Sequence, residues 1–375
     1  MKNIKFYNLS ILNKKYEKYF ISSFKKINNN GRYIIGSYVK KFEKKLSNFC
    51  NSRYAVGVGN CVDAIKLSFM TLKIVGNLKD GDEVLVPANT YVASIIGILS
   101  ANLVPKIVDI NSSTFNINVS QIEESITKKT KAILVVELYG HPSEVDVINK
   151  IAKKYKLQVV LDAAQSLGAS YKKKNVGSYF DLTCFSFFPG KNLGAFGDAG
   201  AIVTKSKKNY EILNSLRNYG EKPFSDLKDR KYINNYIGVN SRLDEIQASV
   251  LLRKLKNFKR DQANREKIAN FYNKNIINKL LIKPVQLKHS NHAWHLYVVK
   301  CKFRNKLKKY LKKNGIETMI HYPRPFYKQP AFSQFIFDKT PTTDKIYNEI
   351  LSIPLHPNLK KKEIQYIVKI INEFK

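Results

Sequence analysis

The segment QVVLDAAQSLGA, residues 158–169, indicates the fold most directly. Its apolar run from Val159 to Leu161 is typical of a strand that is buried on both faces, and the run ends at a carboxylate, Asp162. Strands of this kind occur in parallel sheets that helices cover on both sides. Asp162 would then lie at the carboxyl edge of the sheet, where ligands bind in open α/β folds.

The same alternation extends on either side, from about residue 54 to residue 205. Short β-branched runs alternate with helical patterns, such as the amphipathic stretch at residues 144–155. The predicted strands are residues 55–58, 83–87, 105–110, 132–138, 158–162, 183–187 and 201–205. We therefore expect an α/β fold built on a parallel sheet.

A long helical pattern at residues 241–269 separates this region from the rest of the chain. Beyond it the sequence predicts a strand at 295–301, a helix at 305–314 and a terminal helix at 360–374. We expect a large α/β domain, residues 1–250, and a smaller α+β C-terminal domain, residues 251–375.

The charge balance is strongly basic, with 65 Lys and Arg against 29 Asp and Glu, a formal net charge of +36. Such a charge can indicate nucleic acid or an anionic membrane as partner. The lysines are spread along the whole length, and no arginine-rich stripe or RNP-like motif accompanies them. We attribute the charge to composition bias and expect neither partner. The alternative from another class is a basic regulatory or nucleic-acid-binding protein on the same scaffold.

The remaining composition argues against secretion, a membrane span and a metal site. The N-terminal residues 1–20 lack a continuous apolar core, and no apolar stretch reaches the roughly 20 residues that a bilayer requires. The four cysteines are scattered, which favours reduced thiols in the cytoplasm. His289, His292 and His295 lack the HExxH pattern and nearby carboxylates, so we expect no metal.

The segment VGVGNCVDAIKLSF, residues 56–69, runs from a strand through glycines into a helix. Asn60 is a plausible N-cap, with Asp63 three residues on. Such a helix start presents unpaired N–H groups to a phosphate, although a simple strand-to-helix turn would have the same sequence. Val62 stands where a dinucleotide fingerprint requires glycine, which disfavours a nicotinamide cofactor.

Asp162 and Lys191 are the two residues that suggest chemistry. A buried carboxylate needs a partner, and a protonated pyridine nitrogen is one. Lys191 lies in the loop SFFPGKNLGAFGDAG, residues 186–200, where its amine could be held against an aldehyde. Taken singly, Asp162 could be a capped strand end and Lys191 a solvated lysine. Their occurrence together with Gln165 and Ser186 argues against those interpretations.

At these residues the sequence resembles the DegT/DnrJ/StrS family of nucleotide-sugar aminotransferases. The likeness runs over nearly the whole chain, through the motifs GRYIIGSYVKKFE, VPANTYVAS, VVELYGHPSEVD, VVLDAAQSLGA, CFSFFPGKNLGAFGDAG, LRNYG, GVNSRLDEIQAS, IHYPRP and LSIPLHP. It implies the aspartate-aminotransferase-like fold, type I of the pyridoxal-phosphate enzymes. That fold has a large domain with a central, mostly parallel sheet and a smaller α+β C-terminal domain.

The resemblance implies that this chain uses pyridoxal 5'-phosphate, with pyridoxamine phosphate as the intermediate form. Lys191 would form a Schiff base with the cofactor and, once free, shuttle protons. Asp162 would bind the pyridine nitrogen and Gln165 the ring hydroxyl. Tyr91 would stack on one face of the ring, with Ala164 on the other.

The cofactor's phosphate would lie at the helix start. By the same resemblance, Asn60 opens that helix, the backbone N–H groups of Cys61 and Val62 bind the phosphate, and Ser186 adds a hydroxyl. Asn240 would reach the phosphate from a second subunit. This contact implies a homodimer with shared active sites.

The substrate side follows from the resemblance as well. His321 and Tyr322, with Lys231 and Tyr232, match positions that line the family's sugar-nucleotide cleft. The pattern looks closest to enzymes that aminate TDP-3-keto-6-deoxyhexoses with L-glutamate as donor. The alternative is a 4-aminotransferase acting on a UDP- or TDP-4-keto sugar. Sugar deoxygenation is disfavoured, because such relatives have histidine at the position of Lys191.

Two departures from the family pattern concern the cleft. Cys61 and Val62 replace a glycine and a small or hydroxyl residue, so a side-chain hydroxyl to the phosphate is expected to be missing. The stretch EKPFSDLKDR, residues 221–230, is longer than the family pattern and would reshape the nucleotide cleft.

Overall fold

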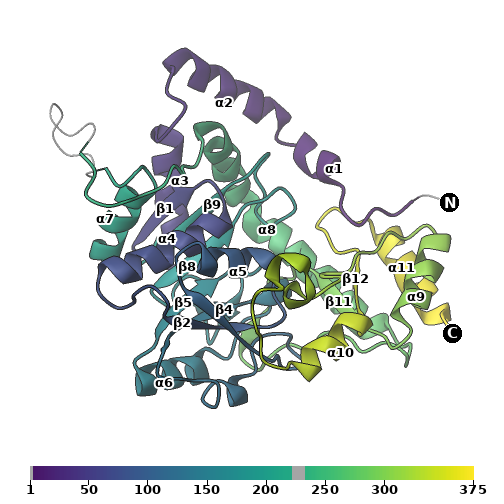
Figure 1. Ribbon diagram of the computed structural model, residues 1–375. Coiled ribbons are helices and arrows are strands. Elements are labelled where there is room, and N and C mark those ends of the chain that lie inside the picture. Colours follow the sequence, from purple (N-terminus) through teal and green to yellow (C-terminus); the bar gives the residue numbers. More distant parts are fainter. Residues whose placement is uncertain (1–2, 222–232) are drawn as a thin grey trace.

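The computed structural model describes residues 3–221 and 233–375 (Figure 1). Its centre is a seven-stranded sheet with the strand order β1-β9-β8-β5-β4-β2-β3. Only β9 runs antiparallel to its neighbours β1 and β8, so the sheet is mostly parallel, as expected. The strands are β1 (Tyr54–Val58), β2 (Glu83–Pro87), β3 (Val104–Val108), β4 (Thr130–Val136), β5 (Gln158–Asp162), β8 (Leu182–Ser186) and β9 (Gly200–Thr204).

Helices cover both faces of this sheet. One core contains strand residues such as Val84 and Val86, and it is covered by α4 (Cys61–Ile74), α5 (Val92–Leu99) and α7 (Lys207–Leu216). The other contains Leu85, between them, and is covered by α3 (Ser37–Phe49), α6 (Val145–Tyr155) and the start of α8 (Glu245–Asn275). Alternate residues of a strand point to opposite faces, which is why continuous apolar runs form these strands.

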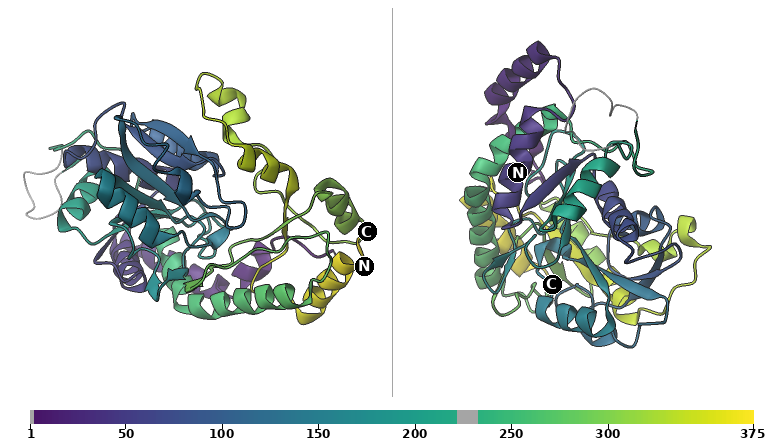
Figure 2. Two further views of the ribbon diagram at one scale, coloured as in Figure 1. Left: turned by 90° about the horizontal axis from the view of Figure 1, so that it is seen from below. Right: turned by 90° about the vertical axis from the view of Figure 1, so that its left-hand side faces the viewer.

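A third core lies in the C-terminal part of the chain. There the second half of α8 packs with the two-stranded antiparallel sheet of β11 (Tyr297–Lys300) and β12 (Ile350–Ile353). The helices α9 (Arg304–Lys313) and α11 (Lys361–Glu373) complete it, and Figure 2 shows α8 leading from the large sheet to this unit. The division after residue 250 stays a prediction, because α8 continues unbroken across that point.

The remaining elements are short or peripheral. They are α1 (Leu9–Lys14), α2 (Glu17–Asn30), α10 (Pro341–Glu349), a small sheet of β6 (Ser170–Tyr171), β7 (Lys174–Asn175) and β10 (Ser290–Asn291), and the 3-10 turns η1 (Val119–Gln121), η2 (Leu138–Gly140), η3 (Phe326–Lys328) and η4 (Pro330–Phe332). Within residues 3–221 and 233–375, no helix is both long and apolar enough to cross a membrane.

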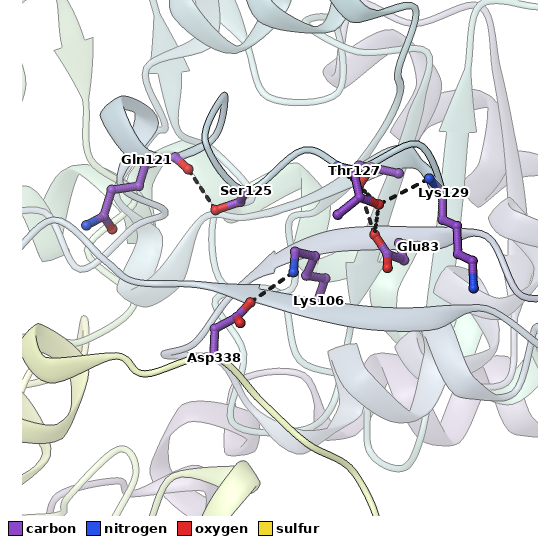
Figure 3. A network of polar contacts seen from close by, with 8 residues as sticks. Glu83, Lys106, Gln121, Ser125, Thr127, Lys129 and Asp338 are labelled. Atoms are coloured by element: carbon purple, nitrogen blue, oxygen red, sulfur yellow. Dashed lines mark hydrogen bonds and ion pairs between the residues drawn. The ribbon is translucent and has the colours of Figure 1, made fainter.

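The segment before α10 lies against the outer strand of the large sheet. Figure 3 shows Lys106 of β3 paired with Asp338, with 3.1 Å between Nζ and Oδ2. Close by, Asp109 accepts hydrogen bonds from the N–H groups of Thr342 and Thr343, at 2.8 and 2.9 Å, and thereby caps the start of α10. These contacts fix the C-terminal chain beside the carboxyl edge of the sheet.

Candidate active site

Asp162 ends β5 at the carboxyl edge of the sheet and is 5% exposed. Ser94 of α5 donates its hydroxyl to Oδ2 at 2.7 Å, and the N–H of Ala164 donates to Oδ1 at 3.0 Å. The Cys61 thiol lies 4.0 Å from the same Oδ1. Burial raises the pKa of Asp162, while Ser94, the Ala164 N–H and the charge of Lys191 offset part of that effect.

Lys191 lies in the loop between β8 and β9, where its charge acts on Asp162. Burial lowers its pKa, and the neighbouring Asp162 and Cys61 oppose that change only in part. The loop is held in place by backbone bonds, since the N–H of Lys191 donates to the Phe188 carbonyl at 2.8 Å. A lysine whose pKa is lowered by desolvation can act as a nucleophile or a base near neutral pH.

The start of α4 supplies the predicted N–H groups. Asn60 is the N-cap, and its side chain accepts a hydrogen bond from the N–H of Asp63 at 2.9 Å. The amides of Cys61 and Val62 precede the first intrahelical bond, from Ala64 N–H to Asn60 C=O, so they remain available to a ligand. Helix termini of this kind favour anions.

The first residue of β9, Gly200, approaches this helix start closely. A Cβ at Gly200 would lie 2.5 Å from the carbonyl carbon of Asn60, so only glycine permits the approach. Gly200 also pairs with Ser186 across β8 and β9, and Ser186 is half-buried. Among the residues that the structure describes, the hydroxyl of Ser186 accepts a single long hydrogen bond, 3.4 Å, from the Phe188 N–H.

Gln165 lies three residues beyond Asp162, and both polar atoms of its side-chain amide form hydrogen bonds. Its Oε1 accepts the Tyr139 N–H at 2.6 Å, and its Nε2 donates to the Tyr322 hydroxyl at 3.0 Å. The ring of Tyr322 lies 5.0 Å from that of Tyr91, centroid to centroid. Tyr91 itself is 53% exposed at the start of α5.

Two histidines lie close enough to Lys191 for its charge to act on them. The pKa of His321 is lowered to about 4, first by burial and then by the charge of Lys191, and its Nδ1 lies 2.8 Å from the Ser352 hydroxyl. The pKa of His295 falls well below its usual value for the same two reasons, and its Nδ1 lies 3.1 Å from Oδ1 of Asn192. Both imidazoles are therefore neutral at pH 7.

The structure thus brings most of the predicted residues together, but not all of them. Asn240 is exposed and forms a backbone bridge with Asn218. Lys231 and Tyr232 lie outside the described residues. Sequence reasoning missed Ser94, which belongs to the quoted motif VPANTYVAS but whose contact with Asp162 spans 68 positions of sequence.

The arrangement has a defined chemical capacity. A half-buried lysine of lowered pKa faces a buried carboxylate, and a helix start with free N–H groups lies beside them. These groups could hold a flat ring that carries a protonated nitrogen and a phosphate.

Comparisons with known proteins find one matching family model and several similar proteins. The model of the DegT/DnrJ/EryC1/StrS aminotransferase family matches residues 14–372. The dTDP-3-amino-3,6-dideoxy-alpha-D-galactopyranose transaminase of Aneurinibacillus thermoaerophilus is 41% identical over 371 residues, 99% of this chain and 99% of that protein.

Two solved structures superpose closely on this chain over nearly its whole length. Streptomyces venezuelae DesV, in complex with a ketimine intermediate, superposes with a TM-score of 0.94 at 32% identity, covering 100% of this chain and 98% of that one. NtdA from Bacillus subtilis, with bound cofactor PMP, superposes with a TM-score of 0.89 at 30% identity, covering 99% of this chain and 85% of that one.

Proposed function

The chain belongs to the DegT/DnrJ/EryC1/StrS aminotransferase family, and from this premise we propose that it aminates the 3-keto group of a TDP-linked 6-deoxyhexose with L-glutamate as donor. It is a pyridoxal-phosphate-dependent sugar transaminase. The observation that carries the proposal is the apposition of Lys191 and the buried carboxylate Asp162, whose charges act on each other, in a site that also contains the helix start capped by Asn60.

The residues of the site fit pyridoxal 5'-phosphate. Asp162 is a buried carboxylate whose hydrogen-bond donors are all neutral, so a protonated pyridine nitrogen would supply the missing positive charge. Because Gly200 has no Cβ, which would lie 3.0 Å from the Cys61 nitrogen, this N–H at the start of α4 is not crowded by β9 and could bind a phosphate. When bound, the cofactor supplies an electron sink for the breaking and forming of bonds at the substrate carbon.

Lys191 is the residue that would link to the cofactor and move a proton at the substrate carbon. Its desolvation increases the fraction of neutral amine at pH 7, which is the form that both tasks require. Asp162 would hold the ring nitrogen protonated, and Ser94 would hold Asp162 in position.

The other cofactor contacts remain part of the proposal. Gln165 would bind the ring hydroxyl, and its two hydrogen bonds support a fixed orientation for that purpose. Tyr91 and Ala164 would enclose the ring.

The phosphate contacts belong to the same proposal. They would come from Ser186 and from the N–H groups of Cys61 and Val62, at the helix start that Asn60 caps. The Cys61 side chain is directed to Asp162, which leaves its backbone as the phosphate ligand.

A homodimer with shared active sites is also proposed. Two large apolar side chains of the predicted site and its loop are exposed in the single chain, Tyr91 at 53% and Phe188 at 55%, and Ile237 is exposed at 93%. Exposed apolar surface of this kind is typical of an interface. Asn240 lies three residues from Ile237 and is exposed, which supports a role toward the partner's phosphate site.

For the sugar nucleotide, His321 and Tyr322 are the described candidates, and Lys231 and Tyr232 follow from the family resemblance alone. Neutral His321 beside Lys191 suits hydrogen bonding to a sugar hydroxyl rather than charge pairing. Amination at C4 of a UDP- or TDP-4-keto sugar is the alternative. Parallel assays with the 3-keto and 4-keto isomers distinguish them, because only the true substrate should restore the cofactor after L-glutamate has aminated it. We assign the protein to the cytoplasm, which its four unpaired, buried cysteines support.

The first test is the visible spectrum of the protein with pyridoxal phosphate, before and after L-glutamate. Borohydride reduction and peptide mass spectrometry should locate the cofactor on Lys191, and Lys191→Ala should abolish both linkage and turnover while remaining folded. Lys254→Met is the matched control. Burial lowers the pKa of Lys254 to about 8, and its Nζ donates to the Gly194 carbonyl at 2.5 Å in the same loop. Linkage to Lys254, or turnover by Lys191→Ala, would refute the proposal.

A further inference from the structure

A cavity of about 720 Å³ lies away from Lys191, at the junction of the large sheet and the C-terminal unit. Its walls come from Ser112, which follows β3, and from residues 279–282, 300–303 and 341–349. In Figure 1 the last of these segments is α10, which lies beside β11. The cavity shares no lining residue with the site around Lys191.

Lysines dominate the charge of this cavity. Lys279, Lys300, Lys302 and Lys345 converge on it from three segments, whereas Glu349 is the one acidic residue in its lining. In the part of the chain that the structure describes, none of the four lysines forms an ion pair. Among the lining residues, only Glu349 offsets the positive charge of these four lysines.

Lys300 is the most constrained of the four. Its Nζ donates to the Ser112 carbonyl at 2.7 Å and lies 5.8 Å from the centre of the Phe115 ring. Burial lowers the pKa of Lys300, Glu349 opposes this, and the like charge of Lys345 lowers it further. An anion between Lys300 and Lys345 would relieve that repulsion, and Lys300 keeps two N–H donors for it.

The start of α10, which forms part of the cavity wall, is not expected to bind the anion. The N–H groups of Thr342 and Thr343 in α10 already donate to Asp109. Anion binding here would depend on the lysine side chains.

The remaining wall is apolar. Ile282 and Phe303 are 57% and 48% exposed, and Ile346 is buried beneath them. Apolar side chains that stay exposed in a cavity favour a ligand with an apolar or aromatic body. The volume lies in the range of pockets that hold drug-sized ligands, roughly 300–1,000 Å³.

From these observations we propose that the cavity binds a nucleoside diphosphate, with its phosphates at Lys300 and Lys345 and its base against Phe303. Because the walls belong to both the sheet and the C-terminal unit, the ligand would hold the two together. This site is separate from the transamination site and does not depend on its substrate.

The test uses the cofactor-loaded protein with ADP and, separately, pyrophosphate as probes, in isothermal titration calorimetry at fixed salt. We expect one ADP per chain in this site and affinity that is about tenfold lower for each lysine lost in Lys300→Met and Lys345→Met. The matched control is Lys267→Met with Lys288→Met, which removes the same charge from exposed positions outside the cavity.

The outcomes separate the explanations. An equal loss of affinity in the control pair would mean diffuse attraction to a basic protein and would overturn the proposal, as would no binding of ADP at all. Pyrophosphate binding as tight as ADP would overturn the role of the apolar wall. The half-reaction with L-glutamate should be unchanged in Lys300→Met and Lys345→Met, so failure of this proposal leaves the transaminase assignment intact.

Discussion

Asp162 and Glu137 follow or end neighbouring strands at the same edge of the sheet, yet their surroundings differ. The two are joined through the backbone, since the Glu137 N–H donates to the Asp162 carbonyl at 3.2 Å. Both side chains are buried, at 5% and 0% exposure. Asp162 has the Ser94 hydroxyl, the Ala164 N–H and the charge of Lys191 as partners. Glu137 accepts the Ser143 N–H at 3.1 Å with one oxygen, and its other oxygen has no hydrogen-bond partner within the described residues.

Equal burial therefore has unequal consequences for charge. Burial raises the pKa of Glu137 to about 7, and the hydrogen bond from the Ser143 N–H opposes this only in part, so this carboxyl is largely protonated below neutral pH. Burial also raises the pKa of Asp162. The charge of Lys191 and the hydrogen bonds from Ser94 and the Ala164 N–H nevertheless favour its charged form. The comparison indicates that the fold accommodates a neutral acid at Glu137, whereas at Asp162 a cation and hydrogen-bond donors favour the charged form, where a cationic ring would bind.

The largest expected effect follows from removing the charge at each position. Asp162→Asn should lower the transamination rate by on the order of 10³-fold, since loss of one partner from a buried charge pair costs about 3–5 kcal/mol. Glu137→Gln should change the rate by less than about threefold, because its carboxyl forms no ion pair within the described residues. Steady-state kinetics with saturating cofactor would measure both. A similar loss of rate in Asp162→Asn and Glu137→Gln would contradict the inferred difference between the two carboxyl groups.

The second effect concerns stability and pH. Because the pKa of Glu137 is raised in the folded state, its contribution to stability is full below the unfolded value near pH 4.5, declines toward pH 7, and is level above it. Glu137→Gln should remove up to about 3 kcal/mol of this pH dependence. Urea unfolding of the wild type and the variant between pH 4.5 and 8, both without cofactor, provides the measurement. Parallel curves for the two proteins would contradict the assigned pKa.

The third effect tests the donors of Asp162. Ser94→Ala removes the shortest bond to the carboxylate, and we expect cofactor to bind about tenfold more weakly, as for a charge-assisted hydrogen bond of roughly 1.5 kcal/mol. Thr90→Val is the control, because Thr90 bonds to Ser94 at 2.7 Å and does not contact Asp162. Equilibrium binding of pyridoxal phosphate and the pH dependence of its visible band should both respond to Ser94→Ala. A larger response to Thr90→Val would assign the effect to packing of α5.

The sequence predicts well those features that depend on residues close together in the chain, and it does not predict contacts between residues far apart in the chain. Each of the seven strands of the large sheet lies within two residues of its predicted start and end, because continuous apolar runs are a local signal. The position of Asp162 at the sheet edge follows from the same signal.

Other features have no local signal. The antiparallel direction of β9 depends on pairing with β1 and β8. The bond from Ser94 to Asp162 depends on how α5 packs against the sheet. Tyr322 was predicted from the family resemblance to bind substrate, and its hydrogen bond to Gln165, 157 residues away, could not be read from sequence.

The smallest expected effect concerns that last bond. Tyr322→Phe removes the hydroxyl that accepts from Gln165 Nε2, while the Tyr139 N–H still holds Gln165 Oε1 and the ring contact with Tyr91 is retained. We expect cofactor affinity to fall by only about threefold, since a neutral hydrogen bond contributes roughly 0.5–1.5 kcal/mol. Gln165→Leu, which removes both bonds, should have the larger effect. If Tyr322→Phe instead weakens cofactor binding as much as Ser94→Ala does, then Tyr322 acts on Asp162 itself. Burial raises the pKa of the Tyr322 hydroxyl, and the charge of Asp162 adds a smaller contribution. The carboxylate's partners would in that case extend across the site to the C-terminal segment, and the contrast with Glu137 would no longer depend on Ser94, Ala164 and Lys191 alone.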